Sequence, residues 1–325
     1  MINNHFLHTD FAPIVLFAFN RPGHLNQALI ALSHNAEFHL SPLFIYCDGP
    51  RNKGDYLNIE RTRAIANQWP HPNKMVIEAQ INQGLAESVI AGVTQVLNRF
   101  GKVIVLEDDL VVDKAFLSFL NRALRKHQDD SRILQISAYM FPIPEFLGRS
   151  ETLFLPNISS WGWATWSRAW AKFDPSASGW ELLLSNKRMR KEFDVGGSYA
   201  YSDMLLRQLN GEIDSWAIRW NWSVYCSSGL VLYPPVSLVK NIGFDGSGRH
   251  CAALDFDGVN SESKINSFNF SNDVNTSKRD LYFIEAALKR LSGPVHKRIL
   301  KKLANNFRRL KLKYKLFYKG ESGKH

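Results

Sequence analysis

Four short apolar runs in the first third of the chain restrict its possible folds more than any other feature of the sequence. Each is followed by polar or turn-forming residues, and they cover residues 13–19, 42–47, 74–78 and 103–106. Continuous apolar runs of this length are typical of strands that are buried on both faces. Helical spacing of apolar residues separates several runs, as in 25–32 and in the stretch that ends at Leu97. This alternation predicts βαβ units and an α/β fold with a mostly parallel central sheet.

Charged and polar residues gather where these predicted strands end. Asn20 and Arg21 follow the first run, Asp48 follows the second, and an acidic triplet at 107–109 follows the fourth. In open parallel sheets, ligands bind beyond the carboxyl ends of the strands. We therefore expect these three groups to lie together at one edge of the sheet and to form a ligand site.

The acidic triplet Glu107-Asp108-Asp109 is the strongest candidate for chemistry. Three adjacent carboxylates repel one another unless a cation or solvent compensates them. Carboxylate oxygens suit Mn²⁺ or Mg²⁺, and such ions are typically held by one or two carboxylates together with substrate phosphates. The triplet therefore predicts a divalent-metal site that binds a diphosphate. The alternative is a solvated loop after a strand.

Composition excludes several classes of protein. With 45% hydrophobic and 22% charged residues, the sequence is that of a folded protein and not of a disordered one. The three cysteines lack the spacing of a zinc or redox site, so we expect reduced thiols. We expect no secretory signal in residues 1–12 and no transmembrane segment, and hence a cytoplasmic protein.

The net charge of +10 is concentrated in the C-terminal tail. Residues 289–325 contain 13 of the 40 Lys and Arg residues but only one of the 30 Asp and Glu residues. Because a nucleic-acid enzyme would carry positive charge across its folded body, we expect no nucleic-acid partner. The tail also predicts a basic amphipathic helix, with apolar residues at Ile299, Leu303, Phe307, Leu310, Tyr314 and Phe317. Such a helix binds an anionic membrane surface, here the inner face of the cell membrane, or else docks on the body of the protein.

Several blocks of the sequence resemble those of known glycosyltransferases. The segment from Lys102 to Val112, followed by Phe116, resembles the metal-site strand of the N-acetylglucosaminyltransferase I family, which has a GT-A fold. The likeness extends to residues 13–21, 46–49, 136–138 and 161–244. Residues 161–166 and 214–220 also resemble blocks of bacterial family 2-type glycosyltransferases of polysaccharide assembly.

The resemblance covers about residues 13–250 and implies a division of the chain. Residues 1–250 would be a GT-A catalytic domain, with a donor-binding half up to about residue 137 and an acceptor-side half at 138–250. Residues 251–288 would form an irregular segment and a helix, followed by the basic tail at 289–325. The activity implied is the inverting transfer of a sugar from a nucleotide-diphosphate sugar, UDP-linked, to a glycan or lipid-linked oligosaccharide of a surface polysaccharide such as O-antigen.

The resemblance also implies roles for residues of the donor site. Asp109 would bind the metal ion, while Glu107 and Asp108 would face the ribose and the sugar hydroxyls of the donor. Arg21 and Asp48 would contact the nucleotide, the first through phosphate and the second through base or ribose. Further donor-site residues expected from their position are Phe19, Asn20, Asn82 and Gly84.

An inverting transfer also needs a general base and an acceptor cleft. The resemblance points to Asp214, just before a tryptophan, as the base that deprotonates the acceptor hydroxyl, with Asp203 as the competing candidate. We expect Trp163 and Trp216 to line the acceptor site, because aromatic faces pack against the apolar faces of sugars. His250 follows a Gly-rich stretch and is expected to complete the metal shell.

Two other functions remain open at this point. A nucleotidyltransferase of sugar activation would share the sheet and the carboxylate-metal chemistry, but it would need a Gly-rich basic loop after the first strand, and residues 19–23 lack that richness. A non-catalytic, membrane-attached carbohydrate-binding protein would leave the carboxylates solvated.

Overall fold

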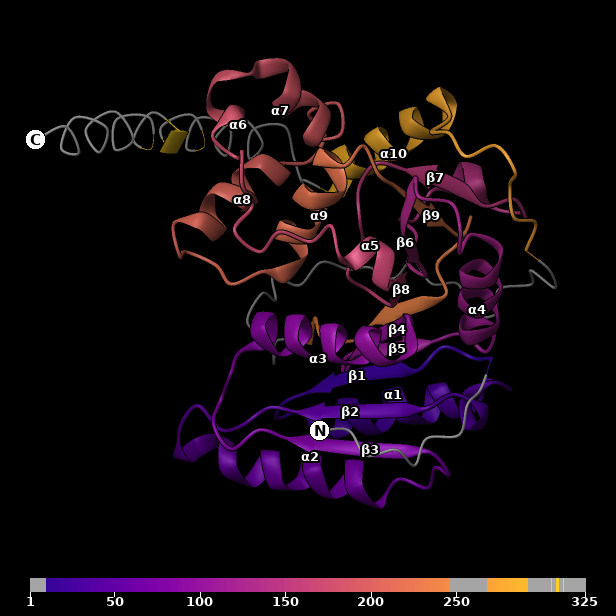
Figure 1. The fold of residues 1–325 in the computed structure, drawn as a ribbon, viewed down its shortest axis with the longest axis vertical. Coiled ribbons are helices and arrows are strands. Elements are labelled where there is room, and N and C mark those ends of the chain that lie inside the picture. The colour runs from indigo at the N-terminus through magenta and orange to yellow at the C-terminus, as the bar shows by residue number, and fades with distance from the viewer. Residues whose placement is uncertain (1–9, 246–267, 292–304, 306–307, 310–311, 313–325) are drawn as a thin grey trace, which may run out of the picture.

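A computed structural model describes residues 10–245 and 268–291 of the protein, together with residues 305, 308, 309 and 312 (Figure 1). An eight-stranded sheet forms its centre. Its strands are β1 (Ile14–Ala18), β2 (Leu43–Cys47), β3 (Lys74–Glu78), β4 (Lys102–Glu107), β6 (Ile133–Ser137), β7 (Leu153–Leu155), β8 (Trp163–Trp166) and β9 (Leu230–Tyr233). They are arranged in the order β3-β2-β1-β4-β8-β6-β9-β7.

The expectation of an α/β fold with a mostly parallel central sheet is confirmed. Strands β3, β2, β1 and β4 are mutually parallel, as are β6 and β9. Strand β8 runs antiparallel to both of its neighbours, and β7 runs antiparallel to β9. Each of the four apolar runs seen in the sequence forms a strand of the parallel half. Strands β1, β2 and β4 are largely buried, as continuous apolar runs predict, whereas β3 is an edge strand and is only partly buried.

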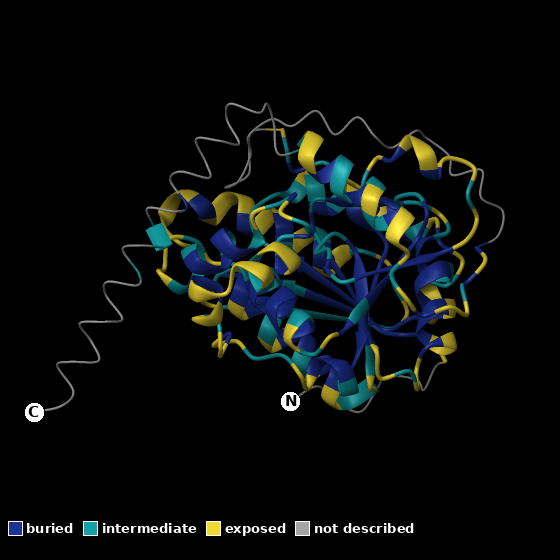
Figure 2. Ribbon diagram, turned by 90° about the horizontal axis from the view of Figure 1, so that it is seen from above, coloured by how far each residue is buried: buried dark blue, intermediate teal, exposed yellow. Residues whose placement is uncertain are grey.

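The strands alternate with helices that cover the sheet. The helices are α1 (Pro22–Ser33), α2 (Tyr56–Gln68), α3 (Leu85–Phe100), α4 (Phe116–Lys126), α5 (Ser167–Trp170), α6 (Leu182–Ser185), α7 (Lys187–Phe193), α8 (Tyr201–Leu209), α9 (Trp216–Cys226) and α10 (Lys278–Leu291). Helix α1 packs against α2, whereas α3 packs against α5 and α9. Figure 2 shows the buried strands at the centre and exposed residues on the outer sides of the helices.

Local sequence explains where several helices begin and end. Pro22 occupies the first position of α1, where its missing N–H costs no intrahelical hydrogen bond. Gly101 ends α3 in a left-handed conformation with φ 72° and donates its N–H to the carbonyl of Leu97 over 2.9 Å. This tight ending lets the chain enter β4 at once, and β4 carries the acidic triplet to the edge of the sheet.

A small second sheet lies beside the end of β4. It pairs β5 (Leu110–Val112) with β10 (Val239–Asn241) in antiparallel orientation. Because β5 directly follows the acidic triplet, this pairing brings the chain around residue 243 to the triplet from more than 130 positions away in the sequence.

The tryptophans of the C-terminal half form core, which corrects one expectation. Trp163 is 0% exposed and Trp216 is 3% exposed, and their rings stack at 5.0 Å. Trp220 is also fully buried, and its indole N–H donates to Gln135 Oε1 over 2.7 Å. Buried indoles satisfied in this way stabilise the layer between β8 and α9. A side chain with no exposed surface cannot line an acceptor cleft, so Trp163 and Trp216 are packing residues.

The remaining expectations about organisation concern the C-terminal region. Residues 268–277 form no helix and pair with the body at Asn269, which bridges to Glu151. The apolar residues of the predicted tail helix and residues 251–267 lie outside the described residues. Among the described helices, none combines the length and apolarity needed to cross a membrane.

We predict that Trp163→Ala lowers the free energy of unfolding by about 3–5 kcal/mol, the usual cost of removing a large buried aromatic side chain. The reason is that the substitution leaves a cavity against Trp216 and Trp170, the two rings that pack on Trp163. Urea denaturation followed by circular dichroism measures the change. Tyr282→Ala, at a side chain whose residue is 69% exposed, is the control and should change stability by no more than about 0.5 kcal/mol. Equal effects of the two substitutions would contradict the core assignment.

Candidate functional site

The polar strand ends predicted from the sequence meet at one edge of the sheet. Ala18 at the end of β1 pairs with Cys47 at the end of β2, and Phe17 pairs with Glu107 at the end of β4. Asp48 continues this edge, since its N–H donates to the carbonyl of Ala18 over 3.0 Å. The side chains that follow these strands therefore face a common region beyond the carboxyl ends of the parallel strands.

Asp109 lies at the centre of the polar contacts at this edge. Arg21 Nη1 donates to Asp109 Oδ2 over 3.1 Å, and the two side chains are only 21% and 17% exposed. The other carboxylate oxygen, Oδ1, is buried and has no hydrogen-bond partner in the part of the chain that the structure describes. A desolvated carboxylate oxygen without a partner is costly, and it is the type of atom that a cation would complete.

Gly243 closes this arrangement from the opposite side. A Cβ at position 243 would lie 2.3 Å from Asp109 Oδ2 and 3.0 Å from Arg21 Nη1, so a larger residue there would displace these two side chains. Its neighbour Ile242 donates its N–H to the carbonyl of Asp109 over 2.8 Å. This segment is part of the resemblance found in the sequence, but no role could be predicted for Gly243. Its contact with Asp109 depends on the pairing of β5 with β10.

The other two members of the triplet are also desolvated. Asp108 is 8% exposed, and its Oδ2 accepts the N–H of Phe19 over 3.1 Å. Burial first, and then repulsion from Asp109, raises the pKa of Asp108 to about 7. The same two causes raise the pKa of Glu107, and burial raises that of Asp109 although Arg21 opposes the shift. The triplet is thus an accumulation of carboxylates that a bound cation would stabilise in the ionised form.

The donor set fits a hard divalent cation held mainly by a substrate. No group of three or more His, Cys, Asp or Glu side chains is arranged as a complete metal-ligand set within residues 10–245 and 268–291. Mg²⁺ and Mn²⁺ do not require one, because one or two carboxylates and the phosphates of a ligand suffice. Asp109 Oδ1 supplies such a carboxylate atom, so the residues present fit this kind of ion.

Asp48 organises the loop that follows β3. Its Oδ1 accepts the N–H groups of Gly49 (2.7 Å) and Gln83 (2.8 Å). Its Oδ2 accepts the side-chain amide of Asn82 (2.8 Å) and the N–H of Gly84 (3.0 Å). Four donors use the ordinary capacity of a carboxylate. The structure thus brings Asp48, Asn82 and Gly84 together as predicted, but it gives Asp48 a structural task that the sequence did not reveal.

Phe19 and Asn20 belong to a second cluster at the same edge. Asn20 donates to Asp55 Oδ1 over 2.7 Å, and Arg51 binds both oxygens of Asp55 at 2.9 and 2.8 Å. The Arg51 guanidinium also lies 4.7 Å from the centre of the Phe19 ring. The sequence analysis did not identify Arg51 and Asp55 as residues of this edge, although their spacing of four residues indicates an ion pair.

The two candidates for a general base differ in their surroundings. Asp214 has a side chain that is 57% exposed, and it lies 3.5 Å from Arg219. Its Oδ2 is 3.4 Å from where a Cβ of Gly84 would be, which places it at the rim of the Asp48 loop. Asp203 is 8% exposed and ion-paired to Arg308. The carboxylate of Asp203 is therefore buried and already ion-paired, whereas that of Asp214 is the more exposed of the two. The role of either residue as the base stays a prediction.

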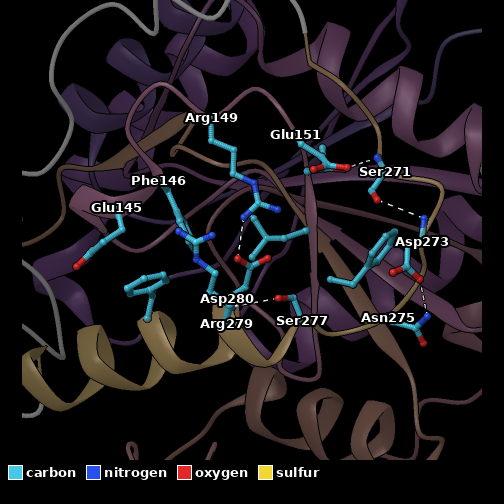
Figure 3. A pocket seen from close by; sticks show the side chains of 14 residues that line it. Glu145, Phe146, Arg149, Glu151, Ser271, Asp273, Asn275, Ser277, Arg279 and Asp280 are labelled. Carbon is cyan, nitrogen blue, oxygen red and sulfur yellow. Dashed lines mark hydrogen bonds and ion pairs between the residues drawn. The ribbon is translucent and has the colours of Figure 1, made fainter.

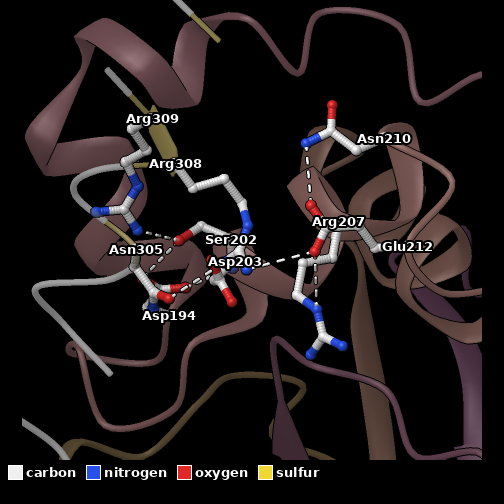
Figure 4. Close-up of polar contacts among 9 residues, drawn as sticks. All are labelled: Asp194, Ser202, Asp203, Arg207, Asn210, Glu212, Asn305, Arg308 and Arg309. Atoms are coloured by element: carbon white, nitrogen blue, oxygen red, sulfur yellow. Dashed lines mark hydrogen bonds and ion pairs between the residues drawn. The ribbon is translucent and has the colours of Figure 1, made fainter. Parts of the chain in front are cut away.

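Arg308 belongs to the C-terminal stretch, where the described residues dock on the body. Figure 4 shows Arg308 and Arg309 approaching α8. Arg308 also pairs with Glu212 at 3.3 Å, and Arg309 donates to Ser202 Oγ over 3.1 Å. At these residues the docked alternative for the tail is therefore observed, while binding of the tail to a membrane stays a prediction.

A histidine of α1 lies near the site. His250 lies outside the described residues, so its predicted role at the metal remains a prediction. His24 on α1, which the sequence analysis missed, lies 3.3 Å from Asp245 Oδ2. It was missed because a lone histidine in a helix gives no signal without its tertiary neighbours.

A pocket of about 470 Å³ lies elsewhere, between β7 and α10 (Figure 3). Its walls include Phe146 and Phe283 and an ion pair of 2.8 Å between Arg149 and Asp280. The carboxylates of the sheet edge are not among its lining residues.

Comparison with known proteins gives only distant structural likenesses. No protein-family profile and no curated protein sequence matches the chain. A mannosyltransferase from Pyrobaculum calidifontis, solved with GDP-Man and Mn²⁺, is 10% identical over 69% of this chain and 72% of its own, with a TM-score of 0.37. The galactosyltransferase LgtC, solved with donor and acceptor sugar analogs, is 10% identical over 68% and 72%, with a TM-score of 0.35.

The bifunctional glycosyltransferase WbbM is a further likeness, at 18% identity and a TM-score of 0.33. It is aligned over 71% of this chain but only 39% of its own length. All three likenesses are too weak to assign a family or a function, and they do not confirm the resemblance to the N-acetylglucosaminyltransferase I family.

We predict that Asp48→Asn loosens the loop at residues 82–84. Asparagine offers a single acceptor oxygen, so at least one of the four donors bound by Asp48 loses its partner at a cost of about 1–3 kcal/mol. Hydrogen exchange measured by mass spectrometry should become faster for the amides of Gln83 and Gly84. Asp129→Asn, at an exposed residue, is the matched control and should leave exchange in this loop unchanged. Unchanged protection in Asp48→Asn would refute the organising role of Asp48.

Proposed function

We propose that this protein is a metal-dependent glycosyltransferase of the GT-A type that uses a nucleotide-diphosphate sugar as donor. The observation that carries the proposal is the state of Asp109. One of its carboxylate oxygens is bound by Arg21, and the other is buried at the carboxyl end of a parallel strand without a partner among the described residues. This geometry suits a divalent cation with a diphosphate better than it suits a solvated loop.

The residues around Asp109 divide the tasks of donor binding. Asp109 would hold Mn²⁺ or Mg²⁺, and Arg21, beside it, would supply positive charge to the diphosphate. Asp48 would shape the nucleotide pocket through the Asn82–Gly84 loop. Glu107 and Asp108 would face the ribose and sugar hydroxyls. When bound, the metal ion would stabilise the negative charge of the departing nucleoside diphosphate.

Asp214 would act as the general base. Its carboxylate lies at the rim of the same edge beside Gly84 and is more than half exposed, so a substrate hydroxyl could approach it within hydrogen-bond distance. Arg219, 11% exposed, lies 3.5 Å away and would orient it. A base on the side of the sugar opposite the diphosphate would give inversion of the anomeric centre.

The finer parts of the proposal extend to substrates and cellular place. We propose a UDP-linked donor and a glycan or lipid-linked glycan acceptor of a surface polysaccharide. A peripheral position on the inner face of the membrane, through the basic tail, would bring the protein to a lipid-linked acceptor.

We predict that Asp109→Asn abolishes metal-dependent nucleotide binding. Thermal-shift measurements with UDP or GDP, each with and without Mn²⁺, should give a metal-dependent rise in Tm for the wild type, because a ligand that binds only the folded state stabilises it. The variant keeps the shape of Asp109 but lacks the charge that binds the cation, so the rise should disappear. Glu181→Gln, an exposed carboxylate on the acceptor-side half, is the control. An undiminished metal-dependent rise in Asp109→Asn would refute the site.

We predict a different result for Asp214→Asn, which should bind nucleotide with Mn²⁺ as the wild type does. Its turnover should fall by about 10²–10⁴-fold, the usual contribution of a general base. Release of nucleoside diphosphate from a panel of nucleotide sugars, with water or a glycoside as acceptor, measures this. Turnover within threefold of that of the wild type would exclude Asp214 as the base. A wild type that binds donor without any turnover would favour a carbohydrate-binding protein.

A further inference from the structure

The sheet edge that carries the acidic triplet continues past β4 into the C-terminal half. Strand β8 is antiparallel to β4, with Val105 opposite Trp163, so β8 begins where β4 ends. Strand β6 pairs with β8 through Ser137 and Trp163, and therefore also ends at this edge. The residues just before β8 and just after β6 must lie beside the triplet, at the level of Glu107.

Four aromatic residues occupy this continuation and form a chain of edge-to-face contacts, which we call the aromatic strip. The ring of Phe141 lies 5.3 Å from that of Tyr139, and Tyr139 lies 4.6 Å from Trp161. Trp161 in turn lies 5.6 Å from Phe244. Trp161, Phe244 and Phe141 are half-buried, unlike the fully buried Trp163 two residues away. The strip therefore borders solvent, whereas the tryptophans behind it are core.

Sequence neighbours and one ring stack link the strip to the two residues proposed for transfer. Phe244 follows Gly243, whose backbone abuts the carboxylate of Asp109. Trp161 lies two residues before Trp163, which stacks on Trp216, itself two residues after Asp214. The strip is thus next to the candidate metal ligand at one end and joined through β8 and α9 to the candidate base.

The acceptor sugar must bind next to the candidate metal ligand and the candidate base. The reason is that its attacking hydroxyl has to approach the anomeric carbon of the donor, which lies beside the diphosphate. Partly exposed aromatic rings can bind the apolar C–H face of a pyranose and leave its hydroxyls free. A nucleobase would also stack on such rings, but the nucleotide is assigned to the ends of β1 to β3 around Asp48, on the other side of Asp109 in the strand order.

We infer that the aromatic strip, with Trp161 and Phe244 at its centre, is the acceptor subsite and binds the terminal sugar ring of a glycan. This inference rests on the proposed function and replaces Trp163 and Trp216 as the acceptor-contacting aromatics.

The test is saturation-transfer NMR on the full chain with UDP and Mg²⁺. The probes are the methyl glycosides of galactose, glucose, mannose and N-acetylglucosamine. Variants are Trp161→Ala and Phe244→Ala, with Trp69→Ala as the control. Trp69 is likewise half-buried but follows α2, next to the starts of β2 and β3 at the opposite edge of the sheet. Thermal shifts with UDP and Mg²⁺ are recorded on all four proteins.

We expect at least one glycoside to bind the wild type and Trp69→Ala, and to bind Trp161→Ala and Phe244→Ala about tenfold more weakly, the loss typical of one aromatic contact. The nucleotide-dependent thermal shift should persist in both strip variants. Should Trp161→Ala fail to fold, Phe244→Ala in its surface turn decides.

Each contrary outcome points to a different failure. Glycoside binding that is unchanged in both strip variants, or absent from a wild type that binds UDP with Mg²⁺, overturns the acceptor subsite while leaving the donor site intact. Absence of any metal-dependent nucleotide binding in the wild type overturns the proposed function itself, and the inference with it.

Discussion

The contact between Arg21 and Asp109 is the interaction on which the candidate site depends. It joins the loop after β1 to the end of β4, and a side chain at position 243 would displace both partners. Neutralising one oxygen of Asp109 reduces the cost of burying it, yet the second oxygen has no partner in the described part of the chain. The negative charge of Asp109 is thus only partly compensated by Arg21, and its second oxygen can still bind a cation.

The surrounding carboxylates have distinct tasks although they look alike in the sequence. Asp48 uses all of its acceptor capacity to fix the loop after β3, and Asp55 does the same for Arg51 and Asn20. Asp203 is paired with Arg308 of the tail. Asp109 and Asp214 are better suited to bind a ligand. Asp109 has an oxygen without a partner among the described residues, and the side chain of Asp214 is exposed.

Aromatic residues of the C-terminal half likewise fall into two sets. Trp163, Trp216 and Trp220 fill the layer between the sheet and α9, and they hold Asp214 in position through the helix that follows it. Trp161 and Phe244 lie at the sheet edge and are partly open. A glycine at position 162 with φ 64° separates the two sets, because it turns the chain between the partly exposed Trp161 and the fully buried Trp163.

The sequence by itself determined the parallel half of the sheet and the grouping of Arg21, Asp48 and Asp109 at its edge. Burial on both faces imposes continuous apolar runs, and parallel strands bring the residues that follow them to one side, so local patterns suffice for these features. Tertiary structure alone decided which tryptophans are core, which carboxylates are already paired, and that Gly243 closes the site. These depend on contacts between segments far apart in the chain, and the number of partners around a polar atom is not encoded in its local spacing.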